Sequence, residues 1–537
     1  MAAYAAVTSL MGTVHLISQS SLDFLESNKE CSKSLYEKVG SLLEFLDNSD
    51  NELMKDLQKK VKDLANEVED EVESQVVRIM EKDKHIQTEA NERLRKILEQ
   101  AIEDIDSVKE ELVKQRNKNN NLQAGNHLLG GSTSPRSRVS TLENDMVGHS
   151  NEQARVRGSL SSKRTLDEWN EVAQSVSSLV NLDDYQRCSG VLALSYNHLP
   201  SHLKACFLYF GVFKKASEIS VENLIRLWMA EGLFKLRGIG ELEKEASSLL
   251  HDLIDKSLIV ACKHSLDGKI KTCKIHDLLH DLCLGELESE SLLYVSDTDV
   301  VQLGRWVSFH QQPTQEFCDL PFPTYDKTRS LHFLEVKSSN FRYELGLDRF
   351  KLLRYELGLD RFKLLRVLDL LGSGLIHFPN GLSNLVSLRY LRAGFICGCL
   401  PIYKLQNLQF LSFRNVSGNK YRVLENLQSV HGLRPDCCTK EMFEGIKKVR
   451  KLGICGQASH FNDSPKCLDN LRYLPELEAL KILSYGHNGS DFLHRLPVPC
   501  GNVFNNGLDM LFNNLGCNLE IEYFVDLKVS YRDLQKS

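Results

Sequence analysis

Two histidines within the segment KIHDLLHDLC have the types and the spacing that come closest to a site for chemistry. His276 and His280 are four residues apart, so a helix would present both imidazoles on one face, as in zinc proteases with the pattern H-E-x-x-H. Asp277 occupies the place of the required glutamate, and no third ligand is evident in the sequence. Because leucines fill the neighbouring positions, we expect a packed helix face, with no metal ion and no catalytic residue.

A run of carboxylates in LANEVEDEVES, residues 64–74, is the second candidate. Neighbouring carboxylates can serve an enzyme as general acid and base. Five carboxylates within seven residues of a helix are more typical of a solvated face, so we expect this run to be exposed to solvent. The five are Glu67, Glu69, Asp70, Glu71 and Glu73.

A loop that could bind the phosphates of a nucleotide is missing from the sequence. Such a loop has the form G-x-x-x-x-G-K-[ST], in which backbone amides and the lysine hold the phosphates and the hydroxyl meets magnesium. The nearest imitation is GSLSSK at residues 158–163, which has the wrong spacing and no second glycine. We therefore expect no nucleotide binding by this route and no ATPase activity.

The helices that must position the carboxylates lie in the first 115 residues. This segment contains no proline and carries 15 Lys and Arg against 25 Asp and Glu. Apolar residues recur every three or four positions over 57–79 and 86–112, and shorter helices fit within 3–25 and 30–47. Since each apolar stripe must be buried against another helix, the pattern predicts a four-helix bundle, with a two-stranded coiled coil as the alternative.

The two histidines belong to a second helical segment. Residues 116–165 are rich in Asn, Gly and Ser and are interpreted as a linker, after which helical periodicity runs over 166–290. Within it, SLIVACKHSLDGKIKTCKI at 257–275 predicts two short strands around an Asp-Gly turn, and helices followed by a hairpin are typical of a winged helix. Residues 191–290 carry 12 Lys and Arg against 14 Asp and Glu, which disfavours DNA binding. Aromatic residues at helical spacing are expected to pack in its core: Phe207, Phe210, Phe213 and Trp228.

A leucine repeat occupies about 300–495 and is followed by an irregular tail at 496–537. Phrases of the form L-x-x-L-x-L centre on Leu368, Leu391 and Leu411, steps of 23 and 20 residues that are typical of leucine-rich repeats. The next clear phrase centres on Leu452, two periods on, which implies one degenerate phrase between them. Stacked phrases predict a solenoid whose concave face carries the polar positions, including Arg366, Arg389, Arg392 and Arg414. The segment RYELGLDRFKLL occurs twice, at 342–353 and at 354–365.

Composition sets the outer bounds of the interpretation. The 537 residues suffice for about three or four domains, and the net charge of −6 indicates no bulk attraction to nucleic acid. The N-terminus has no basic region typical of a secretory signal, and no apolar run is long enough to span a membrane. Fifteen scattered cysteines without a CxxC pair are interpreted as reduced, core-filling thiols of a cytosolic protein.

Three segments carry a resemblance to the plant coiled-coil, nucleotide-binding (NB-ARC), leucine-rich-repeat disease resistance proteins. Residues 192–234 are similar to the end of the nucleotide-binding region. Ile275-His276-Asp277 resembles its Met-His-Asp motif, and residues 143–148, ENDMVG, resemble its opening. The acidic run at 64–74 resembles a motif of the N-terminal bundle. As a whole the chain looks most like the late blight resistance proteins of nightshade plants, with the central nucleotide-binding core missing.

The resemblance implies a function in plant immunity. Such proteins bind ADP or ATP with magnesium, and His276 would be the residue that approaches the ADP phosphate. The resemblance also implies that the acidic run, at Glu69, Asp70 and Glu71, pairs with arginines of the repeats. A pathogen effector or a guarded host protein would be the partner, with homo- or hetero-oligomers of receptors, a cytoplasmic location and peripheral membrane association as further implications. Without the phosphate loop, a decoy or regulatory partner of intact receptors is the alternative.

The resulting expectation is a multidomain protein, mainly α plus an α/β solenoid. Its parts are a helical bundle at 1–115, a linker with the start of the nucleotide-binding region at 116–165, a helical and winged-helix remnant at 166–290, and leucine-rich repeats at 300–495.

Overall fold

The computed structural model divides the chain into two units, Met1–Glu290 and Ser291–Ser537. The residues expected to open a nucleotide-binding domain (143–148), the imitation phosphate loop (158–163) and the segment 166–191 lie outside the described residues. The structure describes residues 2–18, 23–47, 55–80, 83–126, 192, 195–197, 199–234, 239–265, 268–295, 304–310, 327–334, 359–373, 381–396, 405–416, 424–456, 458–464, 466–484 and 518–523.

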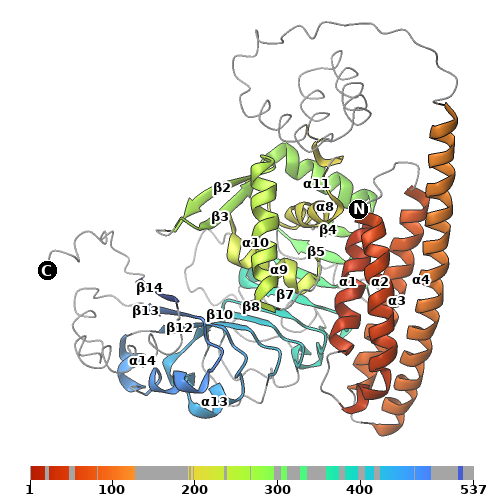
Figure 1. Cartoon of the computed structure of the whole chain (residues 1–537). Coiled ribbons are helices and arrows are strands. Elements are labelled where there is room, and N and C mark those ends of the chain that lie inside the picture. The colour runs from red at the N-terminus through yellow and green to blue at the C-terminus, as the bar shows by residue number, and fades with distance from the viewer. Residues whose placement is uncertain are drawn as a thin grey trace, which may run out of the picture. The chain divides into compact units, whose positions relative to one another are not determined.

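Four long helices open the first unit and run side by side (Figure 1). They are α1 (Ala2–Ser18), α2 (Lys29–Asp47), α3 (Lys55–Ile79) and α4 (Lys84–Asn126), with the short helix η1 (Asp23–Asn28) before α2. Residues spaced three or four apart on each helix share one core, so the pattern of the sequence explains the packing. Fully buried members include Val14, Leu35, Leu43, Val72, Leu94 and Leu98. Helix α4 continues past the expected boundary at 115, so the Asn-rich start of the predicted linker is helical up to Asn126.

A winged helix domain follows in the same unit. Its three-stranded antiparallel sheet has the order β1-β3-β2, and the Asp-Gly hairpin predicted between β2 and β3 is confirmed by their pairing. Gly268 in that turn has φ of +81°, a conformation that glycine adopts without strain. The elements are α8 (Ser201–Leu208), η3 (Tyr209–Val212), β1 (Ile219–Ser220), α9 (Val221–Glu231), α10 (Ile239–Asp255), β2 (Ile259–His264), β3 (Ile270–Ile275) and α11 (Asp277–Ser289).

Aromatic side chains form the core of the winged helix domain, as predicted. Phe207, Phe210 and Trp228 are fully buried, and the rings of Phe210 and Trp228 meet edge-on with centroids 6.1 Å apart. Phe213 is only half-buried. Helix α9, which carries Trp228, begins at the side-chain cap Ser220 and ends at Gly232, whose φ of +75° closes the helix.

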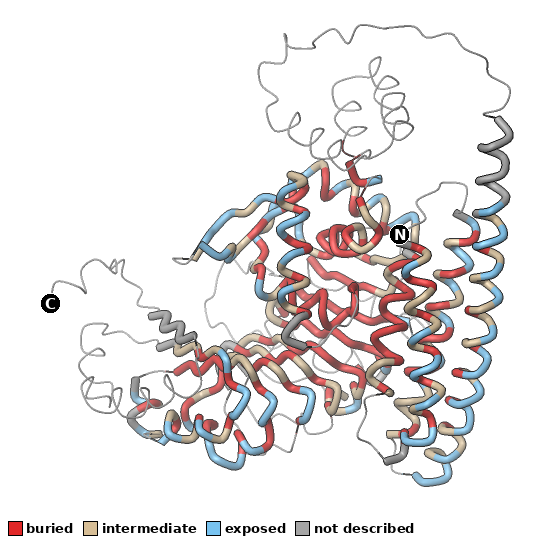
Figure 2. Tube along the Cα trace, in the orientation of Figure 1, coloured by how far each residue is buried: buried red, intermediate tan, exposed pale blue. Residues whose placement is uncertain are grey.

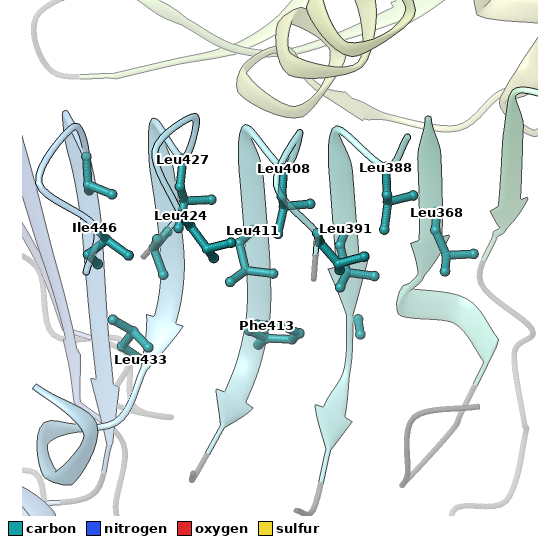
Figure 3. Close-up of a cluster of buried hydrophobic side chains, with 14 of the residues drawn as sticks. Leu368, Leu388, Leu391, Leu408, Leu411, Phe413, Leu424, Leu427, Leu433 and Ile446 are labelled. Atoms are coloured by element: carbon teal, nitrogen blue, oxygen red, sulfur yellow. The ribbon is translucent and has the colours of Figure 1, made fainter. Parts of the chain in front are cut away.

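The described strands of the second unit form one parallel sheet in chain order, apart from β9, which lies off this order and pairs with β10. Side chains at every second position point to the same face, and Figure 3 shows the buried leucines stacking from strand to strand. Leu368, Leu391 and Leu411 occupy equivalent register positions, so the repeat spacing found in the sequence is confirmed. The strands are β4 (Leu293–Val295), β5 (Trp306–Phe309), β6 (Ser330–Phe333), β7 (Val367–Leu370), β8 (Tyr390–Ala393), β9 (Phe395–Ile396), β10 (Phe410–Val416), β11 (Ser429–Leu433), β12 (Lys451–Gly456), β13 (Ala479–Ser484) and β14 (Asn518–Tyr523).

Strand β11 is the degenerate phrase implied between Leu411 and Leu452. Val430 takes the central position, in register with both leucines. The register against β12 then shifts, because Gly432 is inserted as a β-bulge and Leu433 takes the next inward place, opposite Ile454.

Two further findings concern the ends of the repeat region. The second copy of the duplicated segment supplies the helical turn η6 (Leu359–Arg361) and the buried side chains of Phe362 and Leu365 just before β7. Strand β14 lies within the tail that we expected to be irregular, and it pairs in parallel with β13.

Candidate functional site

The two histidines of KIHDLLHDLC have different structural roles in the winged helix domain. His276 is exposed and caps α11, with Nδ1 accepting a hydrogen bond of 3.3 Å from the backbone N–H of Leu278. The expectation of a packed helix face is therefore wrong for His276. His280 is the buried one, and its Nε2 lies 2.7 Å from the carbonyl oxygen of Phe213. This contact ties α11 to the end of η3.

The separation of these roles argues against a metal site at the pair. One imidazole caps a helix at the surface while the other is engaged inside the domain. Across the described ranges, no three His, Cys, Asp or Glu side chains gather in a way that could hold a metal ion.

The acidic run on α3 divides by helical period into two faces. Glu67 and Glu71 are exposed, as expected for a solvated face, and Asp70 is half-buried. Glu69 and Glu73 are buried, which corrects that expectation for both. They lie one helical turn apart, so they share a face of the helix.

Two hydroxyls of α1 hold the buried carboxylates. The Ser9 hydroxyl donates to Glu69 Oε1 over 2.8 Å, and the Thr13 hydroxyl lies 3.1 Å from the same oxygen. Thr13 Oγ1 also lies 3.4 Å from Glu73 Oε1. Buried carboxylates require such donors, because ionised oxygens lose their hydration when they leave water. The presence of serine and threonine in the apolar helix α1 was the sequence signal for a buried polar contact. Their partners on α3 could not be predicted, because residue spacing within one helix does not reveal contacts with a distant one.

The arginines predicted on the repeats fall into two groups. Arg366 and Arg389 are buried rather than exposed on the concave face, and they stand at the residue before β7 and β8. The backbone N–H of Arg389 donates to the carbonyl of Arg366, which places the two in equivalent positions of neighbouring strands. Arg329, before β6, is a third member of this row that the sequence analysis missed, and it is also buried. Its position one residue ahead of a strand phrase was the signal that could have found it.

Arg392 belongs to a separate polar row on neighbouring strands. Its Nε lies 3.4 Å from Oδ1 of Asp369, which stands beside it in the register of β7 and β8. Burial raises the pKa of Asp369, and the Arg392 cation opposes that rise. On β6, burial lowers the pKa of His332 to about 3, with the Arg392 and His310 charges acting in the same direction. The side chain of Arg414 lies outside the described residues.

A comparison with protein families gives a match at the winged helix. Residues 212–283 match the model of the disease resistance protein winged helix domain. The matched range begins at the end of η3 and ends within α11, so it contains β1, α9, α10, the hairpin and the His276 cap. The described helices include none long and apolar enough to cross a membrane.

Curated relatives carry similar descriptions. The ToMV susceptible protein tm-2 of Solanum lycopersicum is 34% identical over 370 residues, which are 60% of this chain and 41% of that protein. The ToMV resistance protein Tm-2(2) of the same plant is 34% identical over 259 residues, 46% of this chain and 28% of the relative. The late blight resistance protein R1-A of Solanum demissum is 35% identical over 146 residues, 27% of this chain and 11% of the relative.

The chain thus spans less than half the length of these relatives. Their names and the winged helix match agree on one group of proteins. The chain is related to the plant disease resistance proteins of the NLR type, among them the late blight R1 group.

Proposed function

We propose that this chain acts in plant disease resistance, as an immune receptor or as a regulator of such receptors. The observation that carries the proposal is the winged helix domain, whose sequence matches the disease resistance model over 212–283 and whose hairpin, aromatic core and capped α11 are all present. A pathogen effector or a guarded host protein would be the partner, and defence with local cell death would be the outcome. Because the described histidine pair and buried carboxylates are engaged in capping and packing, we propose no enzymatic activity for this chain.

The finer architecture belongs to the same proposal. The four N-terminal helices with their shared core would be the receptor's four-helix bundle. The parallel sheet with stacked leucines would be a leucine-rich-repeat solenoid, with the less buried polar positions of its strands, such as Arg392, as the surface for a partner. From the family resemblance we also propose homo- or hetero-oligomers of receptors, a cytoplasmic location and a peripheral membrane association.

An intramolecular contact between the bundle and the repeats would hold the protein at rest. What supports the proposal is the family resemblance, which pairs the acidic run at Glu69, Asp70 and Glu71 with arginines of the repeats; opposite charges would favour such a contact. Charge reversal of Arg414, one of the predicted polar positions of the repeats, combined with reversal at Asp70 should restore a closed form that either change alone opens, as measured by small-angle scattering.

A nucleotide switch of the family's kind does not fit the residues present. The sequence contains no G-x-x-x-x-G-K-[ST], and the Nδ1 of His276 is engaged in capping α11. We propose that neither ADP nor ATP with magnesium is a cofactor of this chain. Isothermal titration of the purified protein should show no saturable binding of either nucleotide, and micromolar affinity would contradict the proposal.

The missing switch favours the decoy or regulatory role over a self-sufficient receptor. A DNA-binding regulator is disfavoured by the acidic balance of the winged helix, and a gel shift at physiological salt should show no retardation. Expression in leaves can distinguish a regulator of receptors from a self-sufficient receptor. Co-expression with the ToMV resistance protein Tm-2(2) under ToMV challenge should weaken resistance if the chain is a regulator. Expression that neither alters this resistance nor causes ion leakage on its own would overturn the immune proposal.

A further inference from the structure

Three contacts within the first unit join the N-terminal helices directly to the winged helix domain. Tyr4 of α1 packs against His202 of α8, with ring centroids 6.4 Å apart. Ser9 Oγ lies 3.4 Å from the backbone carbonyl oxygen of Glu231 at the end of α9. Lys62 of α3 forms an ion pair with Glu290, which follows α11. Figure 1 shows the start of α1 lying beside α8.

The ion pair has the geometry of a specific contact. Lys62 Nζ lies 2.6 Å from Glu290 Oε2, and the two side chains are only 13% and 33% exposed. Partial shielding from water strengthens such a pair relative to one on an open surface. Glu290 is also the C-cap of α11, so the lysine lies near the negative end of that helix dipole.

The second polar contact lies between Ser9 and the C-terminal end of helix α9. The single hydroxyl proton of Ser9 has two acceptors within reach, Glu69 Oε1 at 2.8 Å and the Glu231 carbonyl oxygen at 3.4 Å, so it is shared between α3 and α9 or donated to one of them at a time. Glu231 is the last residue of α9, where the carbonyl groups lack partners within the helix. The joint thus engages α8, α9 and the cap of α11, three different elements of the winged helix domain.

We propose that these contacts form a joint that closes the N-terminal helices onto the winged helix domain without any nucleotide. Every group in the joint is supplied by the chain's own side chains and backbone, and the sequence has no phosphate loop through which ADP or ATP could control it. The joint is a property of the purified protein. It goes beyond the immune role proposed above and would stand if that role were refuted.

Hydrogen exchange of the full-length protein, read by mass spectrometry, tests the joint. The peptides to follow are α1 (Ala2–Ser18) and α8 (Ser201–Leu208), which meet at Tyr4 and His202. Lys62→Glu and Glu290→Lys should each speed exchange in both helices by about tenfold, because each places like charges together. The double exchange K62E/E290K restores opposite charges and should return exchange to the wild-type rate.

A matched control lies two residues away on the same helix. Lys60 pairs with Glu111 of α4, inside the N-terminal helices, so Lys60→Glu should leave α8 unchanged. Addition of ADP, ATP and magnesium, or of a chelator, should change none of these rates. Protection of α1 or α8 that depends on nucleotide would overturn the proposal. The proposal is also overturned if the single charge reversals leave the exchange rates of α1 and α8 unchanged, or if the double variant exchanges as fast as the single variants.

Discussion

Gly432 offers the sharpest test of the repeat packing. It forms the bulge of β11 with φ of +87°, and a Cβ built there would lie 1.9 Å from the carbonyl oxygen of Phe413 on β10. The left-handed conformation alone costs a residue with a side chain roughly 1–2 kcal/mol. The collision is with backbone, so β10 and β11 must also separate. Together these effects should lower the stability of the second unit by at least about 3 kcal/mol on Gly432→Ala.

Differential scanning calorimetry of the full chain measures this change. For a unit of this size, about 3 kcal/mol corresponds to a fall in Tm of roughly 6–12 °C. Gly394→Ala is the matched control in the same sheet, because its nearest neighbouring atom would be 3.9 Å away, at the carbonyl of Leu371. The reasoning is refuted if the two variants melt within about 1 °C of each other.

Three further predictions concern single side chains. Because burial and the Arg392 and His310 charges lower the pKa of His332 from 6.5 to about 3, the unfolded chain binds a proton that the folded unit excludes. Stability is then full above pH 6.5 and falls below it by up to about 1.4 kcal/mol per pH unit, and denaturant midpoints for His332→Asn should lose this slope. His276→Ala should destabilise the winged helix by about 1 kcal/mol in thermal melts, whereas His276→Asn, which keeps a capping group, should not. Cys262, an exposed free thiol on β2, should be alkylated in the native protein well before the buried cysteines.

The periodic parts of the molecule could be predicted from the sequence because each residue's burial there depends on near neighbours. Steps of three and four residues located the buried faces of α3 and α4, and the phrases around Leu368, Leu391 and Leu411 located strands that stack in register. The sequence indicated β11 only as a degenerate repeat phrase and did not predict its bulge, because the inserted Gly432 moves Leu433 out of its expected position.

The candidate sites were harder to predict, because their environments come from distant parts of the chain. Glu69 is a buried acceptor for the hydroxyls of Ser9 and Thr13, which lie 60 and 56 residues earlier in the chain. Arg366 was expected on an open face because polar residues usually lie there, yet its place just before a strand leaves it buried. His276 was assigned to a phosphate or to packing, and its role as a helix cap depends on where α11 begins.

The duplicated twelve-residue segment has a consequence for how such a gene can change. The second copy, at 354–365, supplies the buried residues that lead into β7, and the first copy has the same sequence. Loss of either copy by recombination would therefore leave an identical lead-in and shorten the connection from Phe333 to Leu359 by about half. Since halving a connection alters its closure free energy by only about 0.6 kcal/mol, gain and loss of this segment should be nearly neutral for folding. Selection on stability would then allow alleles of both lengths to persist.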